Sequence, residues 1–159
     1  MLVITSSSLS EYRSCPRRYR YRYVDGREPL RTSTALSFGR AMHGALERWW
    51  KTGPESAVSW LTDNADAVDP VQACKLVAML RHYNPARAEY EVVAVEEPFA
   101  QRLRTPRGVQ SRMTGHVTLE GKRDVIVRRV SDLSLWIVEH KTTSEEIRGF
   151  GPYWQRLAI

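Results

Sequence analysis

An acidic and a basic residue two positions apart, Glu139 and Lys141, stand at the end of an apolar run in the second half of the chain. The run Leu135–Lys141 predicts a β-strand, because it is short, apolar and preceded by turn residues. Side chains alternate between the two faces of a strand, so Glu139 and Lys141 would point the same way and His140 the other way. Ile137 shares the face of Glu139, so the charged pair would emerge where an apolar face ends.

A second carboxylate, Asp124, precedes this run and is separated from it by a turn at Ser131 and Asp132. The turn allows Asp124 to stand near Glu139 on the adjacent strand, although the sequence does not fix the register. Two neighbouring carboxylates bind a hard divalent cation such as Mg²⁺ through oxygen. A bound cation lowers the pKa of water and offsets charge on phosphate, and the ammonium of Lys141 can stabilise the same charge. Such a set is sufficient for phosphodiester hydrolysis.

Each of these residues also has a plainer explanation. A Glu-x-Lys spacing is common at solvated strand ends, and an aspartate beside a turn more often serves the turn itself. His43 lies within an expected amphipathic helix, where a lone histidine more often packs than binds a metal. The same applies to His82, His116 and His140. The separate residues therefore leave both interpretations open.

The N-terminal half of the chain predicts helices. Ser8–Glu11 has a capping-box pattern, and Pro16 should interrupt the helix that follows, because proline removes a backbone donor. Thr34–Lys51 carries an apolar stripe near the 3.6-residue period. Two further helices are expected over Pro54–Asn64 and, after a cap at Asp69 and a proline at the first helical position, to about Tyr83.

The second half predicts a meander of strands. The strands are expected over Glu91–Leu103, Arg112–Leu119, Asp124–Val130 and Leu135–Lys141, with turns at Thr105–Gly108, Glu120–Lys122 and Ser131–Asp132. The last strand is expected to be central, and a new helix is expected over Tyr153–Ile159. Helices followed by strands and a helix favour a layered α/β or α+β fold. At 159 residues we expect one domain, with a helical part over 1–85 and a sheet core over 90–159.

The chain is basic, with a net charge of +6, which suits a polyanionic partner but also suits a merely basic surface. The distribution of the charge is more informative, because arginines and tyrosines alternate in one N-terminal segment. This pattern suits phosphate contact and base stacking, and equally suits a helix with a solvated basic face and a buried tyrosine face. The residues are Tyr12, Arg13, Arg17, Arg18, Tyr19, Arg20, Tyr21, Arg22 and Tyr23.

Several classes of protein are not favoured. No apolar run approaches the roughly 20 residues that cross a bilayer, and Met1–Thr5 lacks the start of a signal peptide, so we expect a cytoplasmic protein. Cys15 and Cys74 are expected to remain reduced there. Two cysteines are too few for a four-thiolate zinc or iron–sulfur site, and Cys74 is expected to pack on an apolar helical face.

Taken in order, the motifs resemble the RecB-type nuclease domain of the PD-(D/E)xK superfamily, which also includes AddB-type helicase–nucleases and CRISPR-associated and phage exonucleases. The resemblance spans nearly the whole chain and implies a restriction-endonuclease-like core, a mixed sheet flanked by helices. It rests on Ser8–Tyr19 (a serine–leucine helix with Cys-Pro and aromatic residues), Phe38–His43 (the histidine helix), Gly121–Asp124 (Gly-x-x-Asp), Val138–Thr142 ((D/E)-x-K-T) and Tyr153–Leu157 (the start of the next helix).

The resemblance implies a metal-dependent DNA exonuclease acting in recombination, repair or phage replication, with DNA and a helicase or recombination protein as partners. His43, Asp124 and Glu139 would bind Mg²⁺ or Mn²⁺, with the backbone carbonyl of His140 as a fourth ligand, and Lys141 would orient or stabilise the attacking water. Glu96 and Glu97 are candidates for an outer shell, although sheet pairing explains them equally well. The expected DNA contacts are Arg13, Arg17, Arg18, Tyr19, Arg20, Arg40 and Gln155.

The chain also departs from the family pattern. A Gln-x-x-x-Tyr motif usually follows, but Gln155 is followed four positions later by Ile159. The three later cysteines that hold an iron–sulfur cluster in some relatives are missing, so no cluster is expected. Cys15 is either a cluster ligand without partners or a small buried residue of a Cys-Pro turn, and we favour the second. We therefore expect a C-terminally incomplete nuclease domain with weak or no activity.

Three hypotheses follow for the function. The first is an enzyme that hydrolyses DNA from an end. The second is a catalytically silent DNA-binding module that retains the nuclease fold and the basic surface. The third is an unrelated α+β protein whose motifs coincide by chance. Metal binding would separate the first two from the third, and chelator-sensitive cleavage would separate the first from the second.

Overall fold

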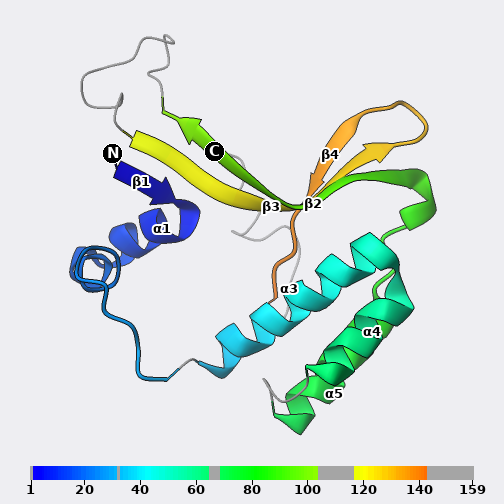
Figure 1. The fold of residues 1–159 in the computed structure, drawn as a ribbon, viewed down its shortest axis with the longest axis horizontal. Helices are drawn as coiled ribbons and strands as arrows, with labels where there is room; N and C mark the ends of the chain where they lie inside the picture. The colour runs from blue at the N-terminus through cyan, green and yellow to red at the C-terminus, as the bar shows by residue number, and fades with distance from the viewer. Residues whose placement is uncertain (1, 32, 65–68, 104–116, 143–159) are drawn as a thin grey trace.

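The computed structural model describes residues 2–31, 33–64, 69–103 and 117–142 (Figure 1). Helices and a four-stranded mixed sheet make up the described fold, which confirms the predicted α/β class. The elements are β1 (Leu2–Thr5), α1 (Ser6–Ser14), α2 (Pro16–Tyr19), the π-helix η1 (Arg20–Val24), α3 (Thr34–Thr52), α4 (Pro54–Asp63), α5 (Pro70–His82), the 3-10 helix η3 (Arg87–Glu89), β2 (Tyr90–Arg102), β3 (Val117–Arg129) and β4 (Leu135–Val138).

The central strand of the described sheet is β3. On one edge it pairs with β2 in antiparallel register over almost its whole length. Its other edge is shared by two short strands: β1 is parallel to its first residues and β4 is antiparallel to its last ones (Figure 1). The expectation that Leu135–Lys141 is the central strand is therefore wrong, since β4 ends at Val138 and pairs only with β3 among the described residues.

The predicted turn at Glu120–Lys122 is also wrong, because β3 runs through it without a break. Gly121 lies opposite Phe99 of β2, and a Cβ atom at Gly121 would stand 2.7 Å from two carbons of the Phe99 ring. The guanidinium of Arg123 covers the same ring, 5.1 Å from its centroid. A glycine in a strand can mark a close approach as well as a turn, and here it admits the aromatic ring. Residues 104–116, with the expected Thr105–Gly108 turn and most of the Arg112–Leu119 strand, lie outside the described part.

The N-terminus begins with a strand that the sequence reasoning did not predict, although Leu2–Thr5 is rich in β-branched residues. Thr5 then caps α1: its Oγ1 accepts from the Ser8 backbone N at 3.1 Å, and Ser8 Oγ accepts from the Thr5 N at 2.9 Å. The capping box thus joins Thr5 and Ser8, whereas Glu11 forms an ion pair with Arg18. The helix starts earlier than expected because a threonine cap was available at the strand end.

Helix α3 packs on β2 and β3, and α4 and α5 pack in turn on α3 (Figure 1). The predicted stripe of α3 is confirmed, because its buried positions recur every three or four residues. The Asp69 cap and Pro70 start of α5 are confirmed too, since the Asp69 carboxylate accepts from the backbone N of Val71 and Gln72. The buried core consists of Ala41, Met42, Ala45, Leu46, Trp49, Trp50, Ala57, Leu61, Leu76, Leu80, Val125 and Val127.

Cys74 is exposed, so its expected place in the core is wrong. Helix α5 turns Leu76 and Leu80 inward, and Cys74 lies two positions before Leu76, which is roughly 200° around the helix. The predicted interruption near Cys15 is confirmed, because Cys15 is extended between α1 and α2. Both thiols are free. Among the described residues, none of the helices combines the length and apolar character that a membrane span requires.

The contact between Gly121 and Phe99 predicts that Gly121→Ala lowers the free energy of unfolding by about 1–3 kcal/mol, the usual cost of overpacking. Urea denaturation measures this change. In a Phe99→Ala background the ring is absent, so the same alanine should be neutral or stabilising, since glycine is unfavourable in a strand. Equal effects in both backgrounds would show that the ring does not require the glycine.

Candidate metal centre

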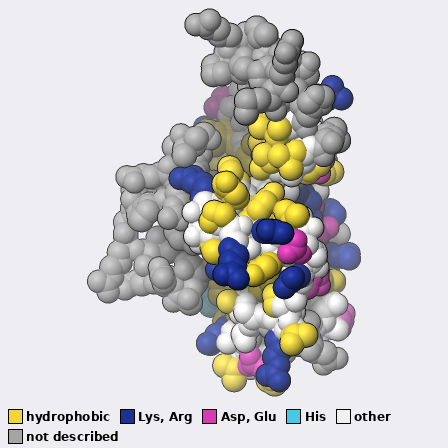
Figure 2. Space-filling view, turned by 90° about the vertical axis from the view of Figure 1, so that its left-hand side faces the viewer, with side chains coloured by type: hydrophobic (Ala, Val, Ile, Leu, Met, Phe, Trp, Pro, Cys, Tyr) yellow, Lys and Arg dark blue, Asp and Glu magenta, His cyan; other side chains and the backbone are white. Residues whose placement is uncertain are grey.

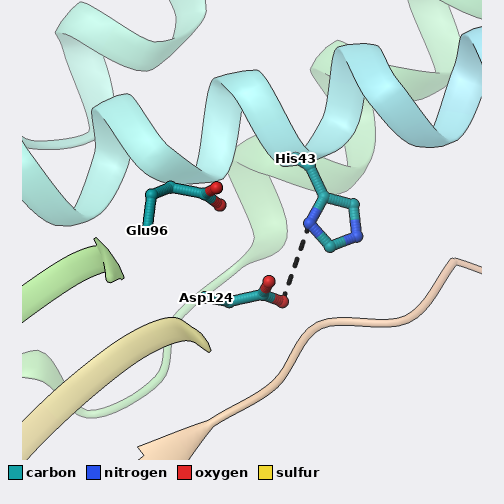
Figure 3. Close-up of side chains that lie close together, drawn as sticks. All are labelled: His43, Glu96 and Asp124. Carbon is teal, nitrogen blue, oxygen red and sulfur yellow. Dashed lines mark ion pairs between the residues drawn. The ribbon is translucent and has the colours of Figure 1, made fainter. Parts of the chain in front are cut away.

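Three side chains from separate elements converge beside α3, near the middle of β2 and β3. His43 of α3, Glu96 of β2 and Asp124 of β3 each offer one ligand atom, and these atoms all lie within 4.8 Å of one another. Figure 3 shows the imidazole and both carboxylates directed toward a common space. His43 Nδ1 lies 3.6 Å from Asp124 Oδ2, and the side chain of Asp124 is only 12% exposed.

Helix α3 brings His43 to this place by packing on the segment that follows β4 (Figure 1). Gly39 lies one turn before His43, on the same side of the helix. A Cβ atom at Gly39 would stand 3.3 Å from Thr142 Oγ1, so the helix and the segment approach closely there. The glycine of the Phe38–His43 motif therefore lets the histidine approach the chain that carries Glu139 and Lys141.

Glu96 has an unusual backbone for a residue inside a strand. Its φ is 58°, in the left-handed region that side chains other than glycine rarely adopt. The flanking pairs Val95–Val125 and Glu97–Arg123 place it directly opposite Asp124. Such a conformation costs of order 1–3 kcal/mol and tends to occur at functional sites.

The sequence offers Glu96 and Glu97 as equivalent outer-shell candidates. In the structure Glu96 belongs to the three-residue group and also pairs with Lys122, whereas Glu97 is exposed and lies opposite Arg123 in the ladder. No signal in the sequence distinguishes the two glutamates, because the left-handed backbone at Glu96 appears only in the folded structure.

Asp124 is held as a carboxylate by its neighbours. Burial alone would raise the pKa of Asp124, but hydrogen bonds from the His140 side chain and backbone, together with the nearby imidazole of His43, bring the pKa below its ordinary value. Asp124 Oδ2 accepts from the His140 backbone N at 2.7 Å and lies 3.5 Å from His140 Nδ1. The group is therefore ionised at neutral pH, as a cation ligand must be.

The residues after β4 are not in a strand, so the alternation expected for them does not apply directly. The imidazole of His140 turns inward, and its side chain is 11% exposed. Glu139 and Lys141 instead form an exposed ion pair with each other. Glu139 is not a member of the three-residue group, and its expected place among the ligands of a shared cation stays a prediction.

The donors of the group fit a divalent cation. Two carboxylates supply the hard oxygen ligands that Mg²⁺ and Mn²⁺ prefer, and an imidazole is a common additional ligand for transition metals. The ligands lie on three elements that the sheet and α3 fix relative to one another. The cluster of His43, Glu96 and Asp124 is therefore a candidate divalent-metal site.

The N-terminal segment with alternating arginines and tyrosines is a solvent-facing surface over α1, α2 and η1. Tyr12 and Tyr23 are exposed, which argues against a buried tyrosine face. Tyr19 packs edge-on against Tyr12 at 5.4 Å and stacks on Tyr23 at 5.2 Å between ring centroids. Figure 2 shows Lys and Arg side chains among hydrophobic ones over the face of the molecule on which this segment lies. The exposed arginines are Arg13, Arg17, Arg18, Arg20 and Arg22.

The remaining predicted residues lie apart from this surface or outside the described part. Arg40 is exposed on α3, three positions before His43. His82 Nδ1 lies 2.8 Å from the Ala78 carbonyl oxygen at the end of α5, a local contact. Gln155 and His116, with the expected helix over 153–159, lie outside the described residues.

Comparison with known families gives a match over almost the whole chain. Residues 3–157 match the family model described as the PD-(D/E)XK nuclease superfamily, so the match includes His43, Asp124 and the Glu139–Lys141 segment. None of the curated proteins matches the chain.

The left-handed backbone at Glu96 predicts that Glu96→Gly is more stable than Glu96→Ala by about 1 kcal/mol, because only glycine adopts this φ without strain. Both variants lack the carboxylate, so their difference in urea unfolding isolates the backbone. Glu97 is the matched control, since it lies in regular strand pairing, and there alanine should be the more stable. The same order at both positions would contradict the strained conformation.

Proposed function

Because the chain belongs to the PD-(D/E)XK nuclease superfamily, we propose that it is a RecB-type exonuclease that hydrolyses DNA phosphodiester bonds with Mg²⁺ or Mn²⁺. The observation that carries this proposal is the convergence of His43, Glu96 and Asp124 from three elements. A cation held there would lower the pKa of water and offset the charge that develops on phosphate.

The other residues of the motif have roles that follow from their placement. The hydrogen bond from the His140 backbone N to Asp124 fixes the chain between Glu139 and Lys141 beside the site. Glu139 is then available as a further cation ligand, and the carbonyl of His140 as another. Lys141 is 52% exposed, so its ammonium can leave Glu139 to orient the attacking water or contact phosphate.

DNA would reach the site along the arginine and tyrosine segment. Exposed guanidinium groups can contact phosphate, and exposed tyrosine rings can stack on bases. Arg40 lies three positions before His43 on α3, so it adds a positive charge to the part of the helix that carries the candidate ligand. A role in recombination, repair or phage replication is part of the same proposal and rests on the resemblance of the motifs.

We expect the chain to degrade linear DNA only with Mg²⁺ or Mn²⁺, at a low rate, and EDTA to stop the reaction. Lys141→Ala should reduce the rate by about 10²-fold or more, since it removes charge stabilisation in the transition state. Release of labelled nucleotides measures the rate. Covalently closed circular DNA should remain intact, because an exonuclease requires an end.

Matched controls separate the outcomes of this assay. Lys75→Ala removes a lysine on the exposed side of α5 and should leave the rate unchanged. Cleavage that persists in EDTA or in Asp124→Asn would rule out the proposed site. Binding of DNA without any cleavage, retained in Glu139→Ala, would favour the catalytically silent module instead.

The proposed DNA path predicts weaker DNA binding in Arg17→Ala and Arg20→Ala. Each lost phosphate contact should reduce the slope of log K against log salt by about 1, because fewer counterions are released. Fluorescence anisotropy with an end-labelled oligonucleotide at several salt concentrations measures the slope. Lys75→Ala serves as the control of equal charge change, and an equal effect of all three variants would show that the segment is not a specific path.

A further inference from the structure

A chain of hydrogen bonds leads from the middle of the core to Asp124. The indole Nε1 of Trp50 lies 3.2 Å from the Tyr83 hydroxyl and 3.4 Å from His140 Nε2. The Tyr83 hydroxyl lies 2.7 Å from the same Nε2. The other side of His140 faces Asp124, through its backbone N at 2.7 Å and through Nδ1 at 3.5 Å.

The hydrogen-bond donors among these three side chains set the direction of the hydrogen bonds. An indole N–H can only donate, so Trp50 requires an acceptor at Tyr83 or His140. Burial raises the pKa of Tyr83 to about 12, so its hydroxyl keeps its proton and can donate to His140 Nε2. With Nε2 as an acceptor, the ring hydrogen of His140 lies on Nδ1 and is directed at Asp124.

We propose that Trp50, Tyr83 and His140 are positioning residues that hold the Asp124 carboxylate in the orientation that binds the cation. This inference rests on the proposed function and extends it to three side chains that do not themselves bind the cation. Partners behind a metal ligand fix its orientation, and their loss commonly weakens metal affinity by about 10–100-fold.

The aromatic rings in this series of hydrogen bonds are packed tightly enough to hold the Asp124 carboxylate rigidly. Trp50 is 1% exposed and lies on the buried face of α3, and Tyr83 ends α5. The ring of Trp49 packs edge-on against both, at 5.1 Å from Trp50 and 5.0 Å from Tyr83 between centroids. The carboxylate is thus tied to the core through two helices as well as through its own strand.

Ordinary satisfaction of buried polar groups is the competing explanation, and Trp49 provides the contrast. Trp49 is 5% exposed and adjacent to Trp50, yet its Nε1 makes no hydrogen bond within the described residues. The core therefore contains one indole that takes part in the chain to Asp124 and a neighbouring one that does not. The two tryptophans form a matched pair for an experiment.

Calorimetric titration of the metal-free protein with Mn²⁺, in the absence of DNA, tests the inference. Tyr83→Phe and Trp50→Phe should each weaken the Kd for Mn²⁺ by about 10-fold or more, whereas Trp49→Phe should leave it unchanged. Tyr83→Phe removes a single oxygen and keeps the ring, so it decides the matter if Trp50→Phe does not fold.

Replacement of His140 adds a test of rescue. His140→Leu should weaken Mn²⁺ binding at least as much as Tyr83→Phe, because it removes the Nδ1 donor. In His140→Asn the side-chain amide occupies nearly the place of Nδ1 and can donate to Asp124, so this variant should retain more affinity. If His140 had only a structural role, the loss of Mn²⁺ affinity in each variant would follow its loss of stability. His140→Asn would then show no selective rescue.

The outcomes separate the inference from the proposed function. Wild-type Mn²⁺ affinity in Tyr83→Phe, with binding abolished in Asp124→Asn, would overturn the positioning role and leave the metal site intact. Absence of saturable Mn²⁺ binding by the wild-type chain would overturn the proposed function and, with it, the inference. Selective loss in Tyr83→Phe and Trp50→Phe but not in Trp49→Phe supports both.

Discussion

The candidate site depends first on the antiparallel pairing of β2 with β3. This long ladder places Glu96 opposite Asp124, and the pairs on either side, Val95–Val125 and Glu97–Arg123, hold that register. A shift of one residue would move every side chain of β2 to the other face of the sheet and separate the two carboxylates. The ladder thus fixes the place of the two carboxylates. Helix α3 and the segment after β4 then bring their side chains to this place.

The second constraint is the packing of α3 on this ladder. Its buried stripe anchors the helix on Val125 and Val127, and the absence of a side chain at Gly39 lets it approach Thr142. His43 therefore meets Asp124 because of contacts made by its neighbours along the helix. The acidic pair and the imidazole come from elements far apart in the sequence, so tertiary packing alone brings them together.

Sequence reasoning succeeded where a local physical signal exists. The stripe of α3 and the Asp69–Pro70 start of α5 follow from the helical period and from cap chemistry. His43 and Asp124 lie close together, and their shared role as metal ligands, which the resemblance of the motifs implies, stays a prediction. The local signal is misleading where a tertiary contact overrides it: Gly121 predicts a turn, but the Phe99 ring that requires a glycine there lies on another strand. Glu96 was not distinguished from Glu97, because a left-handed residue inside a strand has no signature in composition.

The assembly of the ligand set from three elements has a consequence for the energetics of folding. In the unfolded chain these groups are dispersed, so a cation that binds them binds the native state alone and shifts the folding equilibrium by mass action. At a free concentration 100 times the dissociation constant, such linkage contributes about 2.7 kcal/mol. That is a sizeable share of the roughly 5–15 kcal/mol typical of native domains, so the concentration of the free ion would influence the conformational stability of the fold.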